Sequence, residues 1–353
     1  MSVVWEHGFH PLRVRQIVQE TVDTRTYVFV IPDDLRDLFT YRPGQYCTVR
    51  VRIEGDEVLR CYSMSSAPTV DADLAVTVKR VPHGIMSNWL HDHVSVGDTL
   101  ELLKPAGTFC PADTDDAPIV GFCGGSGVTP VFSILKHALV TTPQLVKLFV
   151  AHRDRDSIIF HNELERLRTQ YPDRFTVQYH LDDVAGYVDP AAVRSTMEGT
   201  DTAKIFICGP TPFMNLVESA LAGAGVDPGQ IAIERFVAGG VAPIAEPSPP
   251  VGAGPELGDG LTETLTIVLK GKKAVVTYTP GDTVLDAARR VGLKPPFSCE
   301  LGNCASCMAL VTSGVATMRA NNALTPDEVS EGWVLTCQAL PKGQTVRVEY
   351  ERL

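Results

Sequence analysis

The stretch Gly124-Gly125-Ser126-Gly127-Val128-Thr129-Pro130 lies between an apolar run and a helical pattern. The apolar run, residues 119–122, predicts a strand, and residues 131–139 predict a helix. A glycine-rich turn between a strand and a helix directs backbone N–H groups at a bound diphosphate, because glycine has no side chain to block the approach. The stretch therefore predicts a dinucleotide site in a parallel sheet. A structural tight turn is the alternative, because Pro130 stands where a Rossmann fingerprint would have its third glycine.

Further apolar strands follow this turn. Residues 145–151, 176–180 and 204–208 alternate with helical stretches, which is typical of βαβ units and predicts a nucleotide-binding α/β domain over residues 116–236.

The last of these strands ends in Cys208-Gly209-Pro210. Ligands of open α/β sheets bind at the carboxyl ends of the strands, so Cys208 is a candidate contact for a nicotinamide ring. The alternative is that Cys208 is only a small buried hydrophobe.

Residues 8–112 read as short β-branched runs separated by turn signals such as Arg42-Pro43-Gly44-Gln45 and Ser95-Val96-Gly97-Asp98. This pattern predicts an antiparallel β-barrel. Strand alternation puts Arg60 and Tyr62 on one face, where they can supply a cation for a diphosphate and a stacking surface for a flat ring.

Ser63 follows directly as a hydroxyl donor for a ring nitrogen. About twenty residues later, the turn at residues 84–87 leads into a short helix, whose free amides can hold the other part of a pyrophosphate. A strand with an exposed Arg and a half-buried Tyr is the alternative for this motif taken alone.

Residues 237–260 contain five Pro, six Gly, three acids and no base. This composition predicts a flexible linker over residues 237–261. Beyond it, Cys299-x4-Cys304-x2-Cys307 with a later Cys337 has the ligand spacing of a plant-type [2Fe–2S] ferredoxin.

A structural zinc site is the alternative for these cysteines, but only Cys304 and Cys307 form the close pair that such sites use twice. The surrounding sequence favours a β-grasp ferredoxin domain over residues 262–353. It has expected strands at residues 265–270, 274–279, 308–312 and 345–349 and an expected helix at residues 283–291.

The composition excludes several classes of protein. A formal net charge of −11 argues against nucleic acid or an anionic membrane surface as a partner, because both require a positive footprint. No apolar run approaches the ~20 residues of a membrane span. The N-terminal residues lack a secretory signal pattern, and nine cysteines are expected to stay reduced, so we expect a cytoplasmic protein.

The order of these motifs resembles the ferredoxin–NADP⁺ reductase superfamily, and in particular the reductase components of bacterial multicomponent oxygenases, such as those of phenylacetyl-CoA epoxidase and 3-ketosteroid 9α-hydroxylase. The resemblance covers essentially the whole chain apart from the linker. It implies FAD, a [2Fe–2S] cluster, NADH as the preferred donor over NADPH, and a terminal oxygenase, Rieske-type or di-iron, as electron acceptor. Steroid and aromatic substrates of that oxygenase fit equally well.

The resemblance also implies roles for individual residues. Ser63, Cys208 and Glu234 would be catalytic, with Ser63 near N5 of the flavin and the other two flanking the hydride-transfer site. FAD and the dinucleotide would be held by Arg60, Cys61, Tyr62, Ser63, Val78, Lys79, Arg80, Gly84, Ile85, Met86, Ser87, Gly124, Gly125, Ser126, Gly127, Thr129, Pro130, Arg153, Cys208, Gly209, Pro210 and Phe236. The cluster ligands would be Cys299, Cys304, Cys307 and Cys337.

Two features leave questions open. Ala305 replaces a glycine that the resembled cluster loops usually contain, which would add strain if this position needs a positive φ. After the second strand of the nucleotide domain, Arg153 and Arg155 could hold a 2′-phosphate, whereas Asp154 and Asp156 could hold a free ribose hydroxyl.

A nicotinamide gives two electrons, a [2Fe–2S] cluster accepts one, and a flavin converts between them. An oxygenase reductase is therefore favoured over a stand-alone NAD(P)H oxidoreductase and over a redox sensor without turnover.

Overall fold

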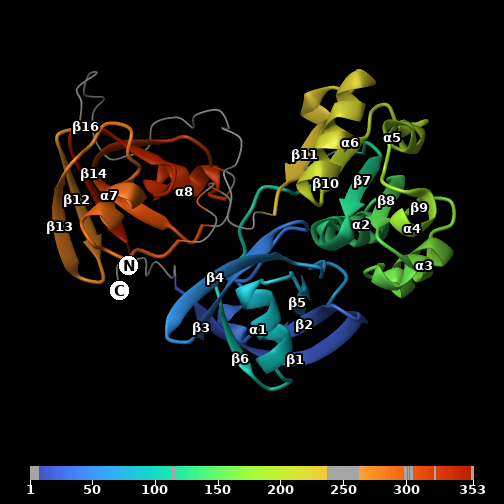
Figure 1. The fold of residues 1–353 in the computed structure, drawn as a ribbon, viewed down its shortest axis with the longest axis horizontal. Coiled ribbons are helices and arrows are strands. Elements are labelled where there is room, and N and C mark those ends of the chain that lie inside the picture. Colours follow the sequence, from blue (N-terminus) through green and yellow to red (C-terminus); the bar gives the residue numbers. More distant parts are fainter. Residues whose placement is uncertain are drawn as a thin grey trace.

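The computed structural model describes residues 8–112, 116–236, 262–297, 300, 302, 305–321 and 323–350. Three sheets form three domains, and Figure 1 shows the second (green to yellow) and the third (orange to red) flanking the first (blue to teal). The predicted linker, residues 237–261, lies outside the described residues. None of the helices in the described ranges combines the length and apolar character that a bilayer crossing requires.

The first domain is a six-stranded antiparallel barrel with the order β4-β3-β6-β1-β2-β5. A bridge between Met64 and Val76 joins its two edge strands, β4 and β5, and so closes the sheet. The Glu54–Gly55 turn between β3 and β4 has positive φ at both residues, as a two-residue hairpin requires. The elements are β1 (His10–Thr21), β2 (Thr24–Val30), η1 (Asp33–Leu35), β3 (Tyr46–Ile53), β4 (Asp56–Ser63), β5 (Leu74–Lys79), α1 (Ile85–His93) and β6 (Thr99–Leu102).

The second domain is a five-stranded parallel sheet with the order β11-β10-β7-β8-β9. Apolar residues of α2 and α3 pack on one face, and those of α5 and α6 pack on the other. The elements are β7 (Ile119–Gly124), η2 (Gly125–Gly127), α2 (Val128–Thr141), β8 (Val146–His152), η3 (Arg155–Ser157), α3 (His161–Gln170), β9 (Phe175–Leu181), α4 (Asp182–Ala185), α5 (Pro190–Met197), β10 (Lys204–Cys208), α6 (Thr211–Gly223), η4 (Pro228–Gln230) and β11 (Ile231–Glu234).

The chain changes direction across this sheet between β7 and β10. From β7 it proceeds outward through β8 to β9, and then returns to the other side of β7 with β10 and β11. The carboxyl ends of β7 and β10 therefore form the switch point at which open α/β sheets bind ligands.

The third domain is a mixed five-stranded sheet with the order β13-β12-β16-β14-β15, in which only the β12–β16 pair is parallel. Helix α7 packs on the sheet, and a capping box between Thr283 and Asp286 sets its start. The elements are β12 (Thr264–Leu269), β13 (Lys272–Thr277), α7 (Val284–Arg290), β14 (Met308–Met318), α8 (Pro326–Ser330), β15 (Trp333–Leu335) and β16 (Ala339–Tyr350).

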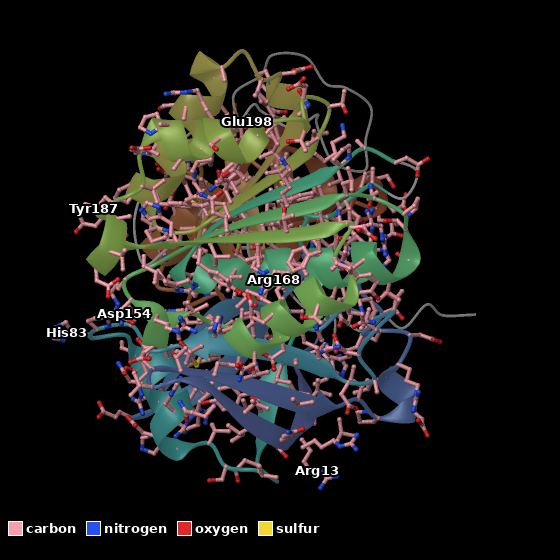
Figure 2. The ribbon with its side chains drawn as sticks, turned by 90° about the vertical axis from the view of Figure 1, so that its right-hand side faces the viewer. Arg13, His83, Asp154, Arg168, Tyr187 and Glu198 are labelled. Carbon is pink, nitrogen blue, oxygen red and sulfur yellow. The ribbon has the colours of Figure 1, made fainter. Side chains whose placement is uncertain are left out.

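Polar contacts join the barrel to the parallel-sheet domain along α2. The Ser133 hydroxyl donates to the Ser66 carbonyl at 2.6 Å, and Lys136 Nζ lies 2.5 Å from Asp71 Oδ2. Figure 2 shows the parallel-sheet domain above the barrel, with Asp154 and His83 near the boundary between them on one side of the molecule. The carboxyl edge of the sheet and the end of β4 are consequently held against each other.

Candidate active site and cluster loop

The residues predicted to face a flavin lie at the end of β4. Arg60 is exposed, with Nη1 donating to the Leu59 carbonyl at 2.7 Å, whereas Tyr62 is half-buried and Ser63 is buried. Cys61 is half-buried, with its sulfur 3.4 Å from Thr48 Oγ1. An exposed guanidinium two residues from a partly exposed aromatic ring fits a flavin dinucleotide, which needs a cation for its diphosphate and a stacking surface for its ring.

The Val78-Lys79-Arg80 stretch presents two cations and one core residue. Val78 is buried in the barrel core. Lys79 Nζ lies 3.7 Å from Asp23 Oδ2, and Arg80 Nη2 lies 2.5 Å from Asp92 Oδ1. Both cations have a carboxylate partner, but Lys79 lies farther from its own than Arg80 does, which makes Lys79 the better placed of the two for a phosphate.

Helix α1 begins after Gly84, and no side chain caps its N-terminus. The Ser87 hydroxyl accepts a hydrogen bond from the Val81 amide at 3.1 Å, which fixes the turn before the helix. Met86 packs in the core and Ile85 is 56% exposed, so these two residues can contribute only their amides to a diphosphate. The uncapped first turn fits the role predicted for residues 84–87.

Three of the four residues in the turn at 124–127 are glycines, which leave the backbone open. A Cβ on Gly127 would lie 2.2 Å from the Cys208 carbonyl oxygen, so the η2 turn approaches the end of β10 this closely only because the residue is glycine. A Cβ on Gly209 would similarly lie 2.9 Å from the Gly124 amide nitrogen. Gly125 has a φ of +53°. This open turn at the switch point fits a dinucleotide diphosphate.

The proline that departs from the Rossmann fingerprint has a structural explanation. Helix α2 begins at Val128, three residues before the predicted start, and Pro130 is therefore in its first turn, where a missing N–H costs no intrahelical bond. The buried Thr129 hydroxyl donates to the Ser126 carbonyl at 3.0 Å and ties the turn to the helix.

Three predicted catalytic residues meet between the domains. The Ser63 hydroxyl donates to Glu234 Oε2 at 3.0 Å, and Glu234 is the Cα partner of Cys208 in the β10–β11 pair. Partial burial raises the pKa of the half-buried Glu234 carboxyl to about 8, although the hydrogen bond from Ser63 acts in the opposite direction. Glu234 is thus mainly a neutral acid at pH 7.

Cys208 is fully buried. Burial raises the pKa of its thiol well above the usual value, and the nearby Glu234 and Cys123 add to this effect. A thiol that stays protonated is a small apolar contact surface rather than a nucleophile.

The predicted nucleotide contacts beyond this centre lie at the edges of the site. Arg153 is exposed and its Nη2 lies 3.5 Å from Asp23 Oδ2. Asp154 caps η3, where Oδ1 accepts from the Ser157 amide at 2.8 Å. Phe236 follows β11 and is 42% exposed.

Asp23 carries no signal in the sequence that would mark it as a site residue. Its carboxylate lies between Lys79 of the barrel and Arg153 of the parallel-sheet domain, and these three residues are far apart in the chain. Asp23 occupies the tight turn between β1 and β2, for which a solvated turn residue is the ordinary expectation. The pairing of β2 with β5 brings Lys79 to Asp23, and only the packing of the two domains adds Arg153.

Two of the four predicted cluster ligands, Cys299 and Cys304, lie outside the described residues. Cys307 and Cys337 are both buried. The Thr336 hydroxyl donates to the Cys307 carbonyl at 2.8 Å, and Gln338 Nε2 lies 3.7 Å from the Cys337 sulfur. An amide donor directed at a buried sulfur fits a thiolate ligand of an iron–sulfur cluster.

Ala305, which stands where the resembled cluster loops usually have glycine, has a left-handed backbone conformation. Ala305 has a φ of +52°, and Gly302 has a φ of +77° with no room for a side chain, since a Cβ would lie 2.7 Å from the Ala320 carbonyl oxygen. An alanine in this region costs ~1 kcal/mol relative to glycine. The strain considered from the sequence is therefore present in the cluster loop.

Three family descriptions match the chain. They are an oxidoreductase FAD-binding domain at residues 11–110, an oxidoreductase NAD-binding domain at residues 122–219 and a 2Fe-2S iron–sulfur cluster binding domain at residues 267–342. The predicted fold classes and the predicted FAD, nicotinamide dinucleotide and [2Fe–2S] cofactors are thereby confirmed.

Curated relatives match over nearly the whole chain. The ferredoxin reductase component of 3-ketosteroid-9-alpha-monooxygenase from Rhodococcus rhodochrous is 37% identical, with 96% of each chain covered. The glycine betaine monooxygenase reductase subunit of Pseudomonas aeruginosa is 32% identical, with 97% of this chain and 96% of the relative covered. A component of the 1,2-phenylacetyl-CoA epoxidase of Escherichia coli is 31% identical, with coverages of 97% and 98%.

The solved structure of phthalate dioxygenase reductase has the same three-domain fold. It aligns with a TM-score of 0.60 and 22% identity over 98% of this chain and 99% of that chain. This chain belongs to the ferredoxin–NADP⁺ reductase superfamily, within its branch of oxygenase reductase components that carry a C-terminal [2Fe–2S] ferredoxin domain.

Proposed function

We propose that the protein takes electrons from NADH and passes them through FAD and the [2Fe–2S] cluster to a terminal oxygenase. The observation that carries the proposal is the meeting of Ser63, Cys208 and Glu234 where the end of β4 faces the carboxyl ends of β10 and β11. FAD, when bound, accepts hydride from the nicotinamide and releases electrons singly.

The chain's own residues have the following proposed roles on the flavin side. Arg60 and the amides of residues 84–87 bind the FAD diphosphate, and Tyr62 stacks on the ring. With FAD bound, the Ser63 hydroxyl would turn from Glu234 to donate its one hydrogen bond near N5 of the flavin.

On the nicotinamide side, the cradle of residues 124–127 binds the dinucleotide diphosphate. Cys208 supplies a small surface for the nicotinamide ring, and its lack of charge keeps the site apolar. Glu234, neutral at pH 7, holds a proton at its carboxyl oxygen beside Ser63. Phe236, which is exposed just beyond the end of β11, would cover the flavin ring.

We propose NADH rather than NADPH as the donor. A 2′-phosphate needs an available cation, but Arg153 lies close to the Asp23 carboxylate, and Arg155 stands in η3 directly between Asp154 and Asp156. Asp154 adds negative charge at the same turn. Together these groups favour a free ribose hydroxyl over a phosphate.

An oxygenase as the final acceptor is supported by the relatives, which include reductase components of two monooxygenases and a component of an epoxidase. A stand-alone NAD(P)H oxidoreductase is the second candidate. A ferredoxin domain speaks against it, because direct hydride transfer to a small molecule does not need a one-electron outlet.

A chain that ends at Phe236 tests the proposal. It contains all the proposed hydride-transfer residues and none of the cluster ligands. We expect it to bind FAD and to reduce ferricyanide with NADH, but not to reduce cytochrome c or a terminal oxygenase. Full-rate delivery to the oxygenase by the shortened chain would show that the cluster is not the outlet.

A further inference from the structure

A salt bridge joins the barrel to the ferredoxin domain. Lys104 Nζ donates to Glu328 Oε1 at 2.8 Å. Lys104 follows β6 of the barrel, and Glu328 lies in α8, on the edge of the ferredoxin domain that faces the rest of the molecule (Figure 1). The two side chains are 29% and 16% exposed, so the pair is partly shielded from solvent.

The helix that carries Glu328 fixes its carboxylate in place. Oε2 accepts from the Thr325 amide at 2.9 Å, and the Thr325 hydroxyl accepts from the Glu328 amide, which together form a capping box. One carboxylate oxygen therefore orders the start of α8, and the other is presented to Lys104. A pre-ordered acceptor loses less side-chain freedom when it forms an ion pair.

A cavity of about 260 Å³ lies beside this salt bridge. Its barrel wall includes Gln45 and Lys104, and its ferredoxin wall includes Ala305 and Ser306, which directly precede the cluster ligand Cys307. The Gln45 carbonyl accepts from the Met64 amide at 2.9 Å, one residue after Ser63. Residues 305–306, at the end of the cluster loop, thus face the part of the barrel that supports the flavin strand.

Within the described residues, the other charged side chains near this cavity form no ion pair between the two domains. Arg50 forms ion pairs with Glu57 and Glu101, which belong to the same barrel domain. Lys270 and Lys294 of the ferredoxin domain also line the cavity and bring further positive charge to it. An interface with an open cavity and a cross-domain ion pair is typical of a reversible contact rather than a permanent one.

We propose that the Lys104–Glu328 salt bridge docks the ferredoxin domain with its cluster loop toward the FAD barrel, and that Lys104 is a positioning residue for electron transfer to the cluster. This inference rests on the proposed electron path. A single partly shielded ion pair changes a docking equilibrium by about two- to fivefold. That is enough to favour the docked arrangement and weak enough to let the cluster loop leave the barrel for a protein acceptor.

The test uses the full-length protein with FAD and cluster bound. Glu328→Gln keeps an oxygen for the capping box but loses the charge, and Asp327→Asn makes the same charge change at an exposed neighbour in the same helix turn. Small-angle X-ray scattering reports docking, and anaerobic stopped-flow mixing with NADH reports cluster reduction after flavin reduction. We expect Glu328→Gln to enlarge the radius of gyration and to slow cluster reduction about two- to fivefold. Asp327→Asn should change neither.

Charge-reversal variants distinguish the effect of losing the ion pair from the effect of losing the helix cap. Glu328→Lys should undock the domain more strongly than Glu328→Gln, and adding Lys104→Glu should restore both the radius and the rate although the cap stays lost. Failure of this double variant to restore them, with FAD and cluster content normal, would overturn the proposal. Normal docking and rates in Glu328→Lys would do the same.

The outcome is separable from the proposed function. If NADH does not reduce the cluster of the unaltered protein, the electron path fails, whereas the scattering data still decide whether this pair docks the domain. If the unaltered protein reduces its cluster and the variants match it, only the docking proposal fails.

Discussion

The Ser63 hydroxyl donates to Glu234 Oε2 at 3.0 Å, across 171 residues of sequence. Ser63 ends β4 of the barrel, and Glu234 ends β11 at the edge of the parallel sheet. The contact therefore places a hydroxyl and a protonated carboxyl where the two proposed cofactor sites meet, and the first predictions below depend on it.

The first prediction concerns Glu234. Ionisation of its carboxyl near pH 8 puts a negative charge between the two sites, so we expect flavin reduction by NADH to slow with an apparent pKa of about 8. Glu234→Gln stays neutral and should show no such decline. Stopped-flow rates between pH 6 and pH 10 measure this, with the exposed Glu198→Gln as the matched control.

The same carboxyl affects stability with a defined sign. The folded-state pKa of about 8 lies above the ordinary 4.5, so the folded chain binds the proton more tightly than the unfolded chain does. The free energy of unfolding should fall as pH rises from about 4.5 to about 8, and Glu234→Gln should reduce this fall. Urea unfolding followed by flavin fluorescence checks it, and an unchanged slope in the variant would contradict the assigned pKa.

The second prediction concerns Cys208. Because the thiol is proposed to contact the reacting ring and not the diphosphate, Cys208→Ala should slow flavin reduction far more than it weakens dinucleotide binding. Cys123→Ala is the control, since Cys123 is the Cα partner of Cys208 on β7 and is equally buried. Equal effects of the two substitutions on hydride transfer would make Cys208 a packing residue only.

The third prediction concerns the cradle. Gly127→Ala would put a Cβ 2.2 Å from the Cys208 carbonyl oxygen, so the glycine turn must move away from the end of β10. We expect at least tenfold weaker NADH binding by calorimetry, a change of about 1.4 kcal/mol, with FAD retained. Gly223→Ala at the end of α6 meets no atom within 4 Å and should leave NADH binding unchanged. Full NADH affinity in Gly127→Ala would exclude this turn as the diphosphate site.

The fourth prediction concerns the cluster loop. Ala305→Gly removes the strain of a left-handed alanine, which stabilises the folded state by ~1 kcal/mol. Glycine also makes the unfolded chain more flexible, which lowers the free energy of unfolding by ~0.5 kcal/mol. We expect a net gain of about 0.5 kcal/mol, seen as retention of the cluster's visible absorbance at higher denaturant concentration. Ala323→Gly, in the same domain but with no positive φ, should lose stability instead. A loss in both variants would mean that the backbone of Ala305 carries little strain.

Features that depend on neighbouring residues could be predicted from the amino-acid order alone. The glycine turn of residues 124–130, the alternation of strands with helices and the spacing of the C-terminal cysteines each span a short stretch, in which backbone geometry and side-chain type are directly readable. Strand β10 was predicted with its observed limits, and β7, β8 and β9 within two residues. The start of α2 was placed too late because a proline in a first helical turn resembles a helix boundary.

The meeting of distant residues, in contrast, followed only from the packing of the folded domains. The hydrogen bond between Ser63 and Glu234 depends on how the barrel packs against the parallel sheet, and the Lys104–Glu328 salt bridge depends on where the ferredoxin domain lies. Neither contact leaves a periodic signal, because each joins surface positions of separately folded units. The φ of Ala305 likewise comes from closure of the cluster loop rather than from alanine's own preference.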